Sequence, residues 1–175
     1  MHIHQIQARH DELQDRIFMR LTTSDECEFQ FWLTRRFMKR FWPVLVKLLE
    51  HDEAVRRQID EAARKAVLGM RHEALLQQSD FSTAFEEREY QRPLGTEPML
   101  VARADCTARA DGLVLLSLRP LQGQGIDLTL DARLLHSIYK LLADALAKAE
   151  WDIDVKAQLA PAETTDSASR PRTIN

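Results

Sequence analysis

Two segments of this 175-residue chain carry the same pattern of apolar residues at an offset of 97 positions, and they align without a gap. In each segment, two runs of alternating apolar residues, typical of β-strands, precede a run with helical spacing. The strand positions that coincide are Ile17, Met19 and Leu21 with Val114, Leu116 and Leu118, followed by Phe29, Phe31 and Leu33 with Ile126, Leu128 and Leu130. Any two strand–strand–helix units would share the coarse pattern, but the constant offset favours an internal duplication.

The alignment continues across the start of each helical run. Thr34 coincides with Asp131, and side chains of both kinds cap helices by accepting a hydrogen bond from a first-turn amide. The helix positions that coincide are Phe37, Phe41, Trp42, Leu45 and Leu49 with Leu134, Ile138, Tyr139, Leu142 and Leu146. Pro43 lies inside the first helical run and removes a backbone donor, so we expect a kink or an interruption near residues 39–42.

The duplication predicts an α+β fold of two pseudo-repeated antiparallel sheet–helix units. Because a half-sheet with one helix is too small to be stable alone, we expect the two units to pack together. A single domain is predicted over residues 1–155, with repeat unit 1 over 3–51, a long connecting helix over 52–78 and repeat unit 2 over 81–151. Residues 156–175 are polar and poor in apolar side chains, which predicts a disordered C-terminal tail.

The connecting helix carries a narrow, alanine-rich apolar stripe. Small side chains let another helix approach closely, and closed two-fold assemblies dominate soluble oligomers, so one interpretation is a homodimer through this helix. The alternative is that the stripe covers the protein's own sheet. The residues of this candidate dimer helix are Val55, Ile59, Ala63, Ala66 and Met70.

Two antiparallel sheet-then-helix modules in one chain resemble the architecture of the Whirly and Pur-alpha single-stranded nucleic-acid-binding proteins. The resemblance covers residues 17–49 and 114–146 and includes no signature motif. It implies that a sheet face binds single-stranded DNA or RNA. Modules of that type have four strands, whereas two strands per unit are clear here and a third is weak, and the long connecting helix is a further departure.

Composition limits the class of protein. A content of 45% hydrophobic and 29% charged residues is ordinary for a globular chain, and a net charge of −3 gives no overall positive field. Two cysteines, Cys27 and Cys106, do not make a disulfide framework or a metal site. No run approaches the roughly 18 apolar residues that span a bilayer, and the N-terminus does not resemble a signal peptide. We therefore expect a cytoplasmic, soluble protein without a cofactor.

One face of the first predicted hairpin interleaves basic and aromatic residues. Such a face can neutralise phosphates and stack bases, so it is a candidate for binding single-stranded nucleic acid. The alternative is that the face is buried between the repeats or across a dimer, because the second copy holds Leu113 and Leu115 there. The candidate residues are Arg16, Phe18, Arg20 and Trp32.

The densest basic patch follows directly, in the run "RRFMKR". Its members are Arg35, Arg36, Lys39 and Arg40. Residues 34–72 hold ten Lys or Arg against five Asp or Glu, a local net charge of +5 that suits an anionic partner. The patch could equally contact the acidic stretch "FEEREY" of the same chain, or remain solvated.

No catalytic constellation stands out. The chain has no nucleophile elbow and no glycine-rich phosphate loop, and the histidines His2 and His4 lack a third ligand for a metal. The sequence therefore favours a non-catalytic binding or adaptor protein, homo-oligomeric and with an unknown protein partner. The alternative is single-stranded DNA or RNA binding, and a third is an enzyme whose site the sequence does not disclose.

Overall fold

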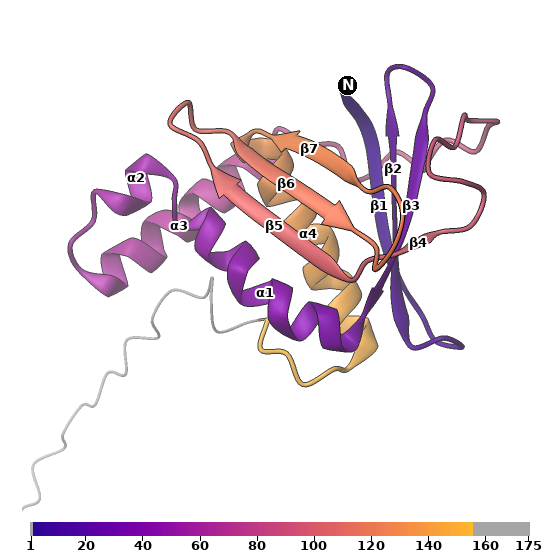
Figure 1. Ribbon diagram of the computed structural model, residues 1–175. Helices are drawn as coiled ribbons and strands as arrows, with labels where there is room; N and C mark the ends of the chain where they lie inside the picture. Colours follow the sequence, from indigo (N-terminus) through magenta and orange to yellow (C-terminus); the bar gives the residue numbers. More distant parts are fainter. Residues whose placement is uncertain (1, 156–175) are drawn as a thin grey trace, which may run out of the picture.

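A computed structural model describes residues 2–155 as an α+β fold with two sheets (Figure 1). The first unit is a three-stranded meander followed by a helix, and the second unit repeats this order. The elements of the first unit are β1 (Ile3–Asp11), β2 (Arg16–Thr23), β3 (Glu28–Thr34) and α1 (Arg35–Leu49). Those of the second are β5 (Arg103–Ala108), β6 (Val114–Arg119), β7 (Ile126–Leu130) and α4 (Ala132–Ala149).

Strand register confirms that the two units are copies of one pattern. Ile17 of β2 pairs with Leu33 of β3, and a shift of 97 positions gives Val114 and Leu130, which pair in the same way. The helix caps also coincide, since Thr34 and Asp131 each accept a hydrogen bond from an amide three residues on. Each unit has a third strand, β1 or β5, so the prediction of two clear strands per unit was too low.

The helices are exchanged between the units. We expected each helix to cover its own sheet, but α4 packs mainly against β1, and α1 contacts β5 as well as β3. Where the helices cross, the equivalent residues Trp42 and Tyr139 stack on each other with ring centroids 4.6 Å apart and planes at 23°. A contact between two equivalent residues marks a two-fold relation, so the units are arranged like the subunits of a dimer.

The connection between the units contains two helices. The continuous helix predicted over 52–78 is a short α2 (Glu53–Arg56) and a longer α3 (Glu61–Leu76), which packs on α4. The break arises because Asp60 starts a new helix by accepting a hydrogen bond from Ala63 N. The candidate dimer stripe is therefore not one face: Val55 is fully buried, whereas Ile59 lies between the helices and is 98% exposed.

α1 runs unbroken through Pro43, contrary to the expected interruption. Pro43 and Val44 lie on the exposed side of the helix, so the carbonyl of Lys39 that loses its partner faces water. The buried side carries the apolar residues Met38, Phe41, Trp42, Leu45, Val46 and Leu49. A proline on the solvent side thus costs the helix one hydrogen bond but no core packing.

A segment without regular structure, residues 77–98, runs from α3 across the outer face of the first sheet; we call it the strap. It ends in β4 (Met99–Leu100), which pairs in parallel with β3 and extends that sheet to four strands. Val101 N then donates to Trp32 O of the first sheet and Ala102 N donates to Arg119 O of the second. The second unit therefore begins at β5 and not at residue 81.

After α4 the chain is tied back onto the first unit. Trp151 is buried, and its Nε1 donates to Asp15 Oδ1 at 2.7 Å, while Asp152 pairs with Arg35 at 2.7 Å. The tail predicted over residues 156–175 lies outside the described residues. Among those described, no helix combines the length and apolar character needed to cross a bilayer.

Candidate functional site

The outer face of the first sheet carries a row of four side chains, one from each strand. Arg9, Phe18, Trp32 and Leu100 are neighbours in the register of β1, β2, β3 and β4. The Arg9 guanidinium lies 5.0 Å from the Phe18 ring centroid, and the Trp32 ring lies 5.1 Å from it on the other side. Phe18 is 8% exposed and Trp32 is half-buried, so this face is not an open aromatic platform.

The strap covers the basic part of the same face. The guanidinium of Arg20 lies 3.8 Å from the ring centroid of Phe85 and donates to both carboxylate oxygens of Glu87. It also donates to Gln7 at 2.8 Å, and the buried carboxylate of Glu28 lies 3.7 Å away. The charge of Arg20 is thus satisfied within the chain. Arg16, farther along the strand, is half-buried and has no ion pair among the described residues.

The basic run on the first two turns of α1 is exposed. Arg35 pairs with Asp152, whereas Arg36, Lys39 and Arg40 have no carboxylate partner in residues 2–155. Arg36 and Arg40 are one helical turn apart, where like charges repel, and no acidic residue stands in the first turn of α1. The positive end of the helix dipole adds to this repulsion. Local choices that oppose stability are expected at functional sites, so this cluster is a candidate for binding an anion.

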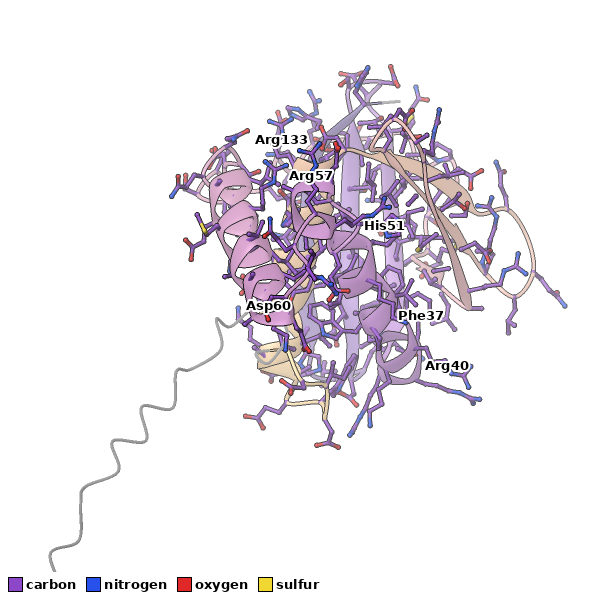
Figure 2. All side chains as sticks on the ribbon, turned by 90° about the vertical axis from the view of Figure 1, so that its left-hand side faces the viewer. Phe37, Arg40, His51, Arg57, Asp60 and Arg133 are labelled. Carbon is purple, nitrogen blue, oxygen red and sulfur yellow. The ribbon has the colours of Figure 1, made fainter. Side chains whose placement is uncertain are left out.

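A groove lies beside this cluster, and we call it the α1 groove. Arg36, Phe37 and Arg40 form one wall. Figure 2 shows Phe37 and Arg40 of this wall on α1. The other walls are residues 93–95 at the end of the strap, residues 99–102, where the chain passes between the sheets, and the β6–β7 loop, residues 120–124. The hollow has about 1140 Å³, above the roughly 300–1000 Å³ of small-molecule pockets, and this size favours an extended chain as the ligand.

The floor and rim of the α1 groove are aliphatic. Leu100 is 44% exposed and Leu121, at the tip of the β6–β7 loop, is 89% exposed. Half-buried Leu94 and Phe37 complete the apolar surface. The sequence indicated the arginines but not these leucines, because Leu94 and Leu100 come from the end of the strap and from β4, whereas Leu121 comes from the β6–β7 loop. One signal was available: Leu121 is a large apolar residue in a turn of Gly and Gln.

A second polar cluster joins the helices of the connection to α4. The Nδ1 atoms of His72 and His136 are 2.9 Å apart, so the Nδ1–H of one ring donates a hydrogen bond to the unprotonated Nδ1 of the other. Burial, followed by the neighbouring His72, lowers the pKa of His136 to about 4, and burial also lowers the pKa of His72. Asp52 pairs with Arg71 at 2.7 Å and caps α2.

This histidine cluster is a structural clamp. The ion pair of Asp52 with Arg71 ties α2 to α3, and the pair of His72 with His136 ties α3 to α4. Across residues 2–155, no group of three or more His, Cys, Asp or Glu side chains is placed to hold a metal ion. The α1 groove, where the charges lack partners, is therefore the stronger candidate site.

Comparison of the chain with models of protein families, with curated proteins and with solved structures gives no match. The functional argument therefore starts from the residues and geometry of the α1 groove.

Proposed function

We propose that the protein is a non-catalytic binding protein that holds an extended segment of a partner protein in the α1 groove. The proposal rests on two kinds of side chain that lie close together. Arg36, Lys39 and Arg40 lack counter-ions among the described residues, and the leucines Leu100 and Leu121 beside them are exposed. Unpaired cations favour an anionic ligand, and exposed aliphatic side chains favour a ligand that is also apolar. A polypeptide with acidic and apolar residues supplies both.

A protein partner fits this groove better than a nucleic acid. Bases stack on open aromatic faces, but Phe18 is buried and Arg20 is already paired with the strap. The apolar groups that face the groove are mainly aliphatic, with Phe37 as the one aromatic among its lining residues. We place the protein in the cytoplasm, where the free thiols of Cys27 and Cys106 would remain reduced.

Site-specific photo-crosslinking in cells tests the proposal. A benzophenone amino acid placed at Leu121, on the rim of the α1 groove, should give a discrete protein–protein adduct. The adduct should disappear when Arg36→Glu and Arg40→Glu are added, because reversing both charges repels an acidic segment. The matched control is the same amino acid at Leu13, which is fully exposed in the β1–β2 turn and far from the groove in the sequence.

The outcomes separate the alternatives. A Leu121 adduct that depends on the two arginines supports the proposal. Equal adducts from Leu121 and Leu13, or none from Leu121, would rule out the groove as a protein-binding site. A Leu121 adduct that is destroyed by nuclease would replace the protein partner with a nucleic acid.

Single-stranded nucleic acid is a second candidate ligand, and it rests on Trp32 and Arg16. Trp32 is half-buried on the outer face of the first sheet. Arg16 lies on the same face of the hairpin, at the opposite side of Trp32 from Gln30, and has no ion pair among the described residues. If this function is right, an oligonucleotide binds at low salt and Trp32→Ala weakens it by about 1–3 kcal/mol. Salt-independent binding, or an unchanged affinity of the variant, would reject it.

We also propose a homodimer, now through α3 instead of a continuous helix. Met70 on α3 is 70% exposed, and Ile59, which precedes the start of α3, is 98% exposed. Because exposed apolar side chains gain from mutual burial, a second copy could cover them. Light scattering should then give twice the mass of the chain, and Met70→Glu should return it to the mass of a monomer.

A further inference from the structure

The two-fold relation of the units gives the α1 groove a counterpart elsewhere in the molecule. A second hollow is lined by Arg133, Leu134 and Ser137 on α4, which are the equivalents of Arg36, Phe37 and Arg40 at the offset of 97. Its other walls are the start of β1 and strap residues 78–85, whereas the α1 groove is lined by Val101 and Ala102, just before β5. Figure 2 places Arg133 at one end of the molecule and Phe37 and Arg40 at the other.

The chain itself bonds to both walls of this second hollow. Ser79 Oγ lies 3.0 Å from Ser137 Oγ of α4, and Gln5 of β1 accepts a hydrogen bond from Glu86 N at 3.0 Å. Gln5 Nε2 also donates to Ala84 O at 3.4 Å. The strap therefore runs from the start of α4 to the start of β1, with a turn at Asp80, whose carboxylate accepts hydrogen bonds from Ser82 N and Thr83 N.

The strap segment has a definite chemistry. Residues 78–90 read "QSDFSTAFEEREY", with four carboxylates, three aromatic rings and one cation. His4 lies 4.0 Å from Glu86, and Arg20 binds Glu87 and faces Phe85. Carboxylates thus meet basic groups of the first unit, and an aromatic ring meets a guanidinium. These contacts are made along β1 and β2, at and beside the second hollow, and they show a segment of this composition bound to basic side chains of the protein.

The α1 groove carries more positive charge than the second hollow, and no segment of the described chain forms hydrogen bonds or ion pairs with the side chains of Arg36 or Arg40 on its wall. Ser137 of the second hollow is replaced by Arg40, and Arg36, Lys39 and Arg40 have no partner among the described residues. The lining of the α1 groove therefore carries the higher positive charge, since Arg36 and Arg40 line it without a carboxylate, whereas Arg133 lines the second hollow together with Asp80. An acidic segment should gain more from these unpaired cations than the strap gains at the second hollow.

We infer that the α1 groove recognises an extended acidic segment with aromatic side chains, similar in chemistry to the chain's own strap. This rests on the proposed function, since it specifies the partner segment for that same groove. A carboxylate of the partner would pair with Arg36 or Arg40, and its apolar side chains would lie against Leu100 and Leu121. The partner is a protein, identified by this segment.

The test uses the full chain and a fluorescent peptide with the strap sequence of residues 78–90. Fluorescence polarisation should show saturable binding, and Arg36→Glu with Arg40→Glu should weaken it by about tenfold or more. Both substitutions place acidic residues at the start of α1, where they favour the helix, so the variant should fold, as circular dichroism can verify. The matched control is Lys47→Glu, because Lys47 is exposed in the last turn of α1 and has no ion pair among the described residues, and it should leave the affinity unchanged.

Two further measurements make the result decisive. A peptide in which the three glutamates and the aspartate are replaced by lysine should not bind, and Arg133→Glu should have no effect. Weakening by Arg133→Glu alone would mean that the peptide exchanges with the strap, and the inference would fall. Equal binding of the lysine peptide would also overturn it, as would no binding of the strap peptide. In those cases an arginine-dependent crosslink at Leu121 would still uphold the proposed function with a partner of other chemistry.

Discussion

At the scale of single residues, the histidine pair makes stability depend on pH. His72 and His136 cannot both be protonated while they share this hydrogen bond, and burial disfavours a charge on either ring. Lys140 and Arg71 lie near enough to disfavour that charge further, whereas Glu73 and Asp52 oppose them. Because the pKa of His136 is about 4 in the folded state, the unfolded chain takes up a proton at this residue between pH 6.5 and 4 that the folded chain resists. The lowered pKa of His72 acts in the same direction.

The sign of the effect follows from linkage. The contribution of the two neutral histidines to the free energy of unfolding is complete above pH 6.5 and is lost as the pH falls. The free energy of unfolding should therefore drop by about 2 kcal/mol between pH 7 and 4.5. Urea denaturation at several pH values measures this slope. His136→Leu should flatten the slope, and the exposed His51→Asn should leave it unchanged. A slope that His136→Leu does not alter would contradict the assignment.

A second residue-scale prediction concerns Tyr139, which stacks on Trp42 where the helices cross. Its hydroxyl is buried, has no hydrogen-bond partner among the described residues, and burial raises the pKa of Tyr139 to about 12. Because a buried unpaired hydroxyl costs free energy, Tyr139→Phe should raise the free energy of unfolding by about 1 kcal/mol. Tyr139→Leu, which removes the stacked ring, should lower it. Denaturation with urea compares the three proteins, and a less stable Tyr139→Phe would show that the hydroxyl is satisfied.

At the scale of elements, the strap is held on the first sheet chiefly through Arg20 and the buried Glu28. Arg92 of the strap also donates to Glu28, at 2.9 Å. Arg20→Ala should lower the free energy of unfolding by about 2–3 kcal/mol, since a buried carboxylate loses one of its two cations. Adding Glu28→Gln should recover part of the loss, because a neutral amide needs less compensation.

The rate of trypsin cleavage measures directly how firmly the strap is held on the first sheet. Arg20→Ala should speed cleavage after Arg88, because the strap loses its contacts through Glu87 and Phe85. The control is Arg109→Ala, which keeps the cleavage site, since the ion pair of Arg109 with Asp111 is exposed, lies outside the strap and should contribute less than about 1 kcal/mol. Unchanged cleavage in Arg20→Ala would mean that other contacts hold the strap.

The elements of the repeats could be predicted from the sequence because their signals are local. Alternation at Ile17, Met19 and Leu21 and a cap at Thr34 each fix a strand or a helix start without knowledge of the rest of the chain. The break between α2 and α3 was missed because Asp60 competes as a cap inside a stretch with helical periodicity. Nothing in the strap's own pattern indicated that it covers a sheet, since its contacts with Gln5 and Arg20 span more than 65 residues.

The candidate site was predictable in part for the same reason. Arg36, Lys39 and Arg40 form a dense basic run that is visible in one line of sequence. The face with Arg16, Phe18, Arg20 and Trp32 was also placed on one side of the hairpin, as the register shows. Its partial cover by the strap depends on tertiary structure and could not be deduced. The leucines of the α1 groove reach it from loops that only the packing of the two units brings together.

At the scale of the whole molecule, the exchange of helices makes each unit depend on the other. The apolar side of β1 and β2 is covered by α4 of the second unit, and β5 contacts α1 of the first. Neither sheet is covered by its own helix alone, so the interface between the units is the core of the protein. An ancestral homodimer of single units would have needed the same contacts, and the fused chain supplies them within one molecule.

This dependence predicts the behaviour of a split chain. Fragments 1–58 and 59–175 are divided in the exposed link between α2 and α3, where Ile59 contributes almost no packing. Each fragment alone should lack a cooperative thermal transition, because its sheet loses the partner's helix, and mixing should give a folded 1:1 complex. Near-ultraviolet circular dichroism reports the Trp42–Tyr139 stack, and analytical ultracentrifugation gives the mass.

The control is the intact chain with a short Gly-Ser insertion at the same link, which should lose no more than about 1 kcal/mol of stability. A cooperative transition in either fragment alone would show that a unit folds without its partner, and the two-fold core would then be an association of independent domains.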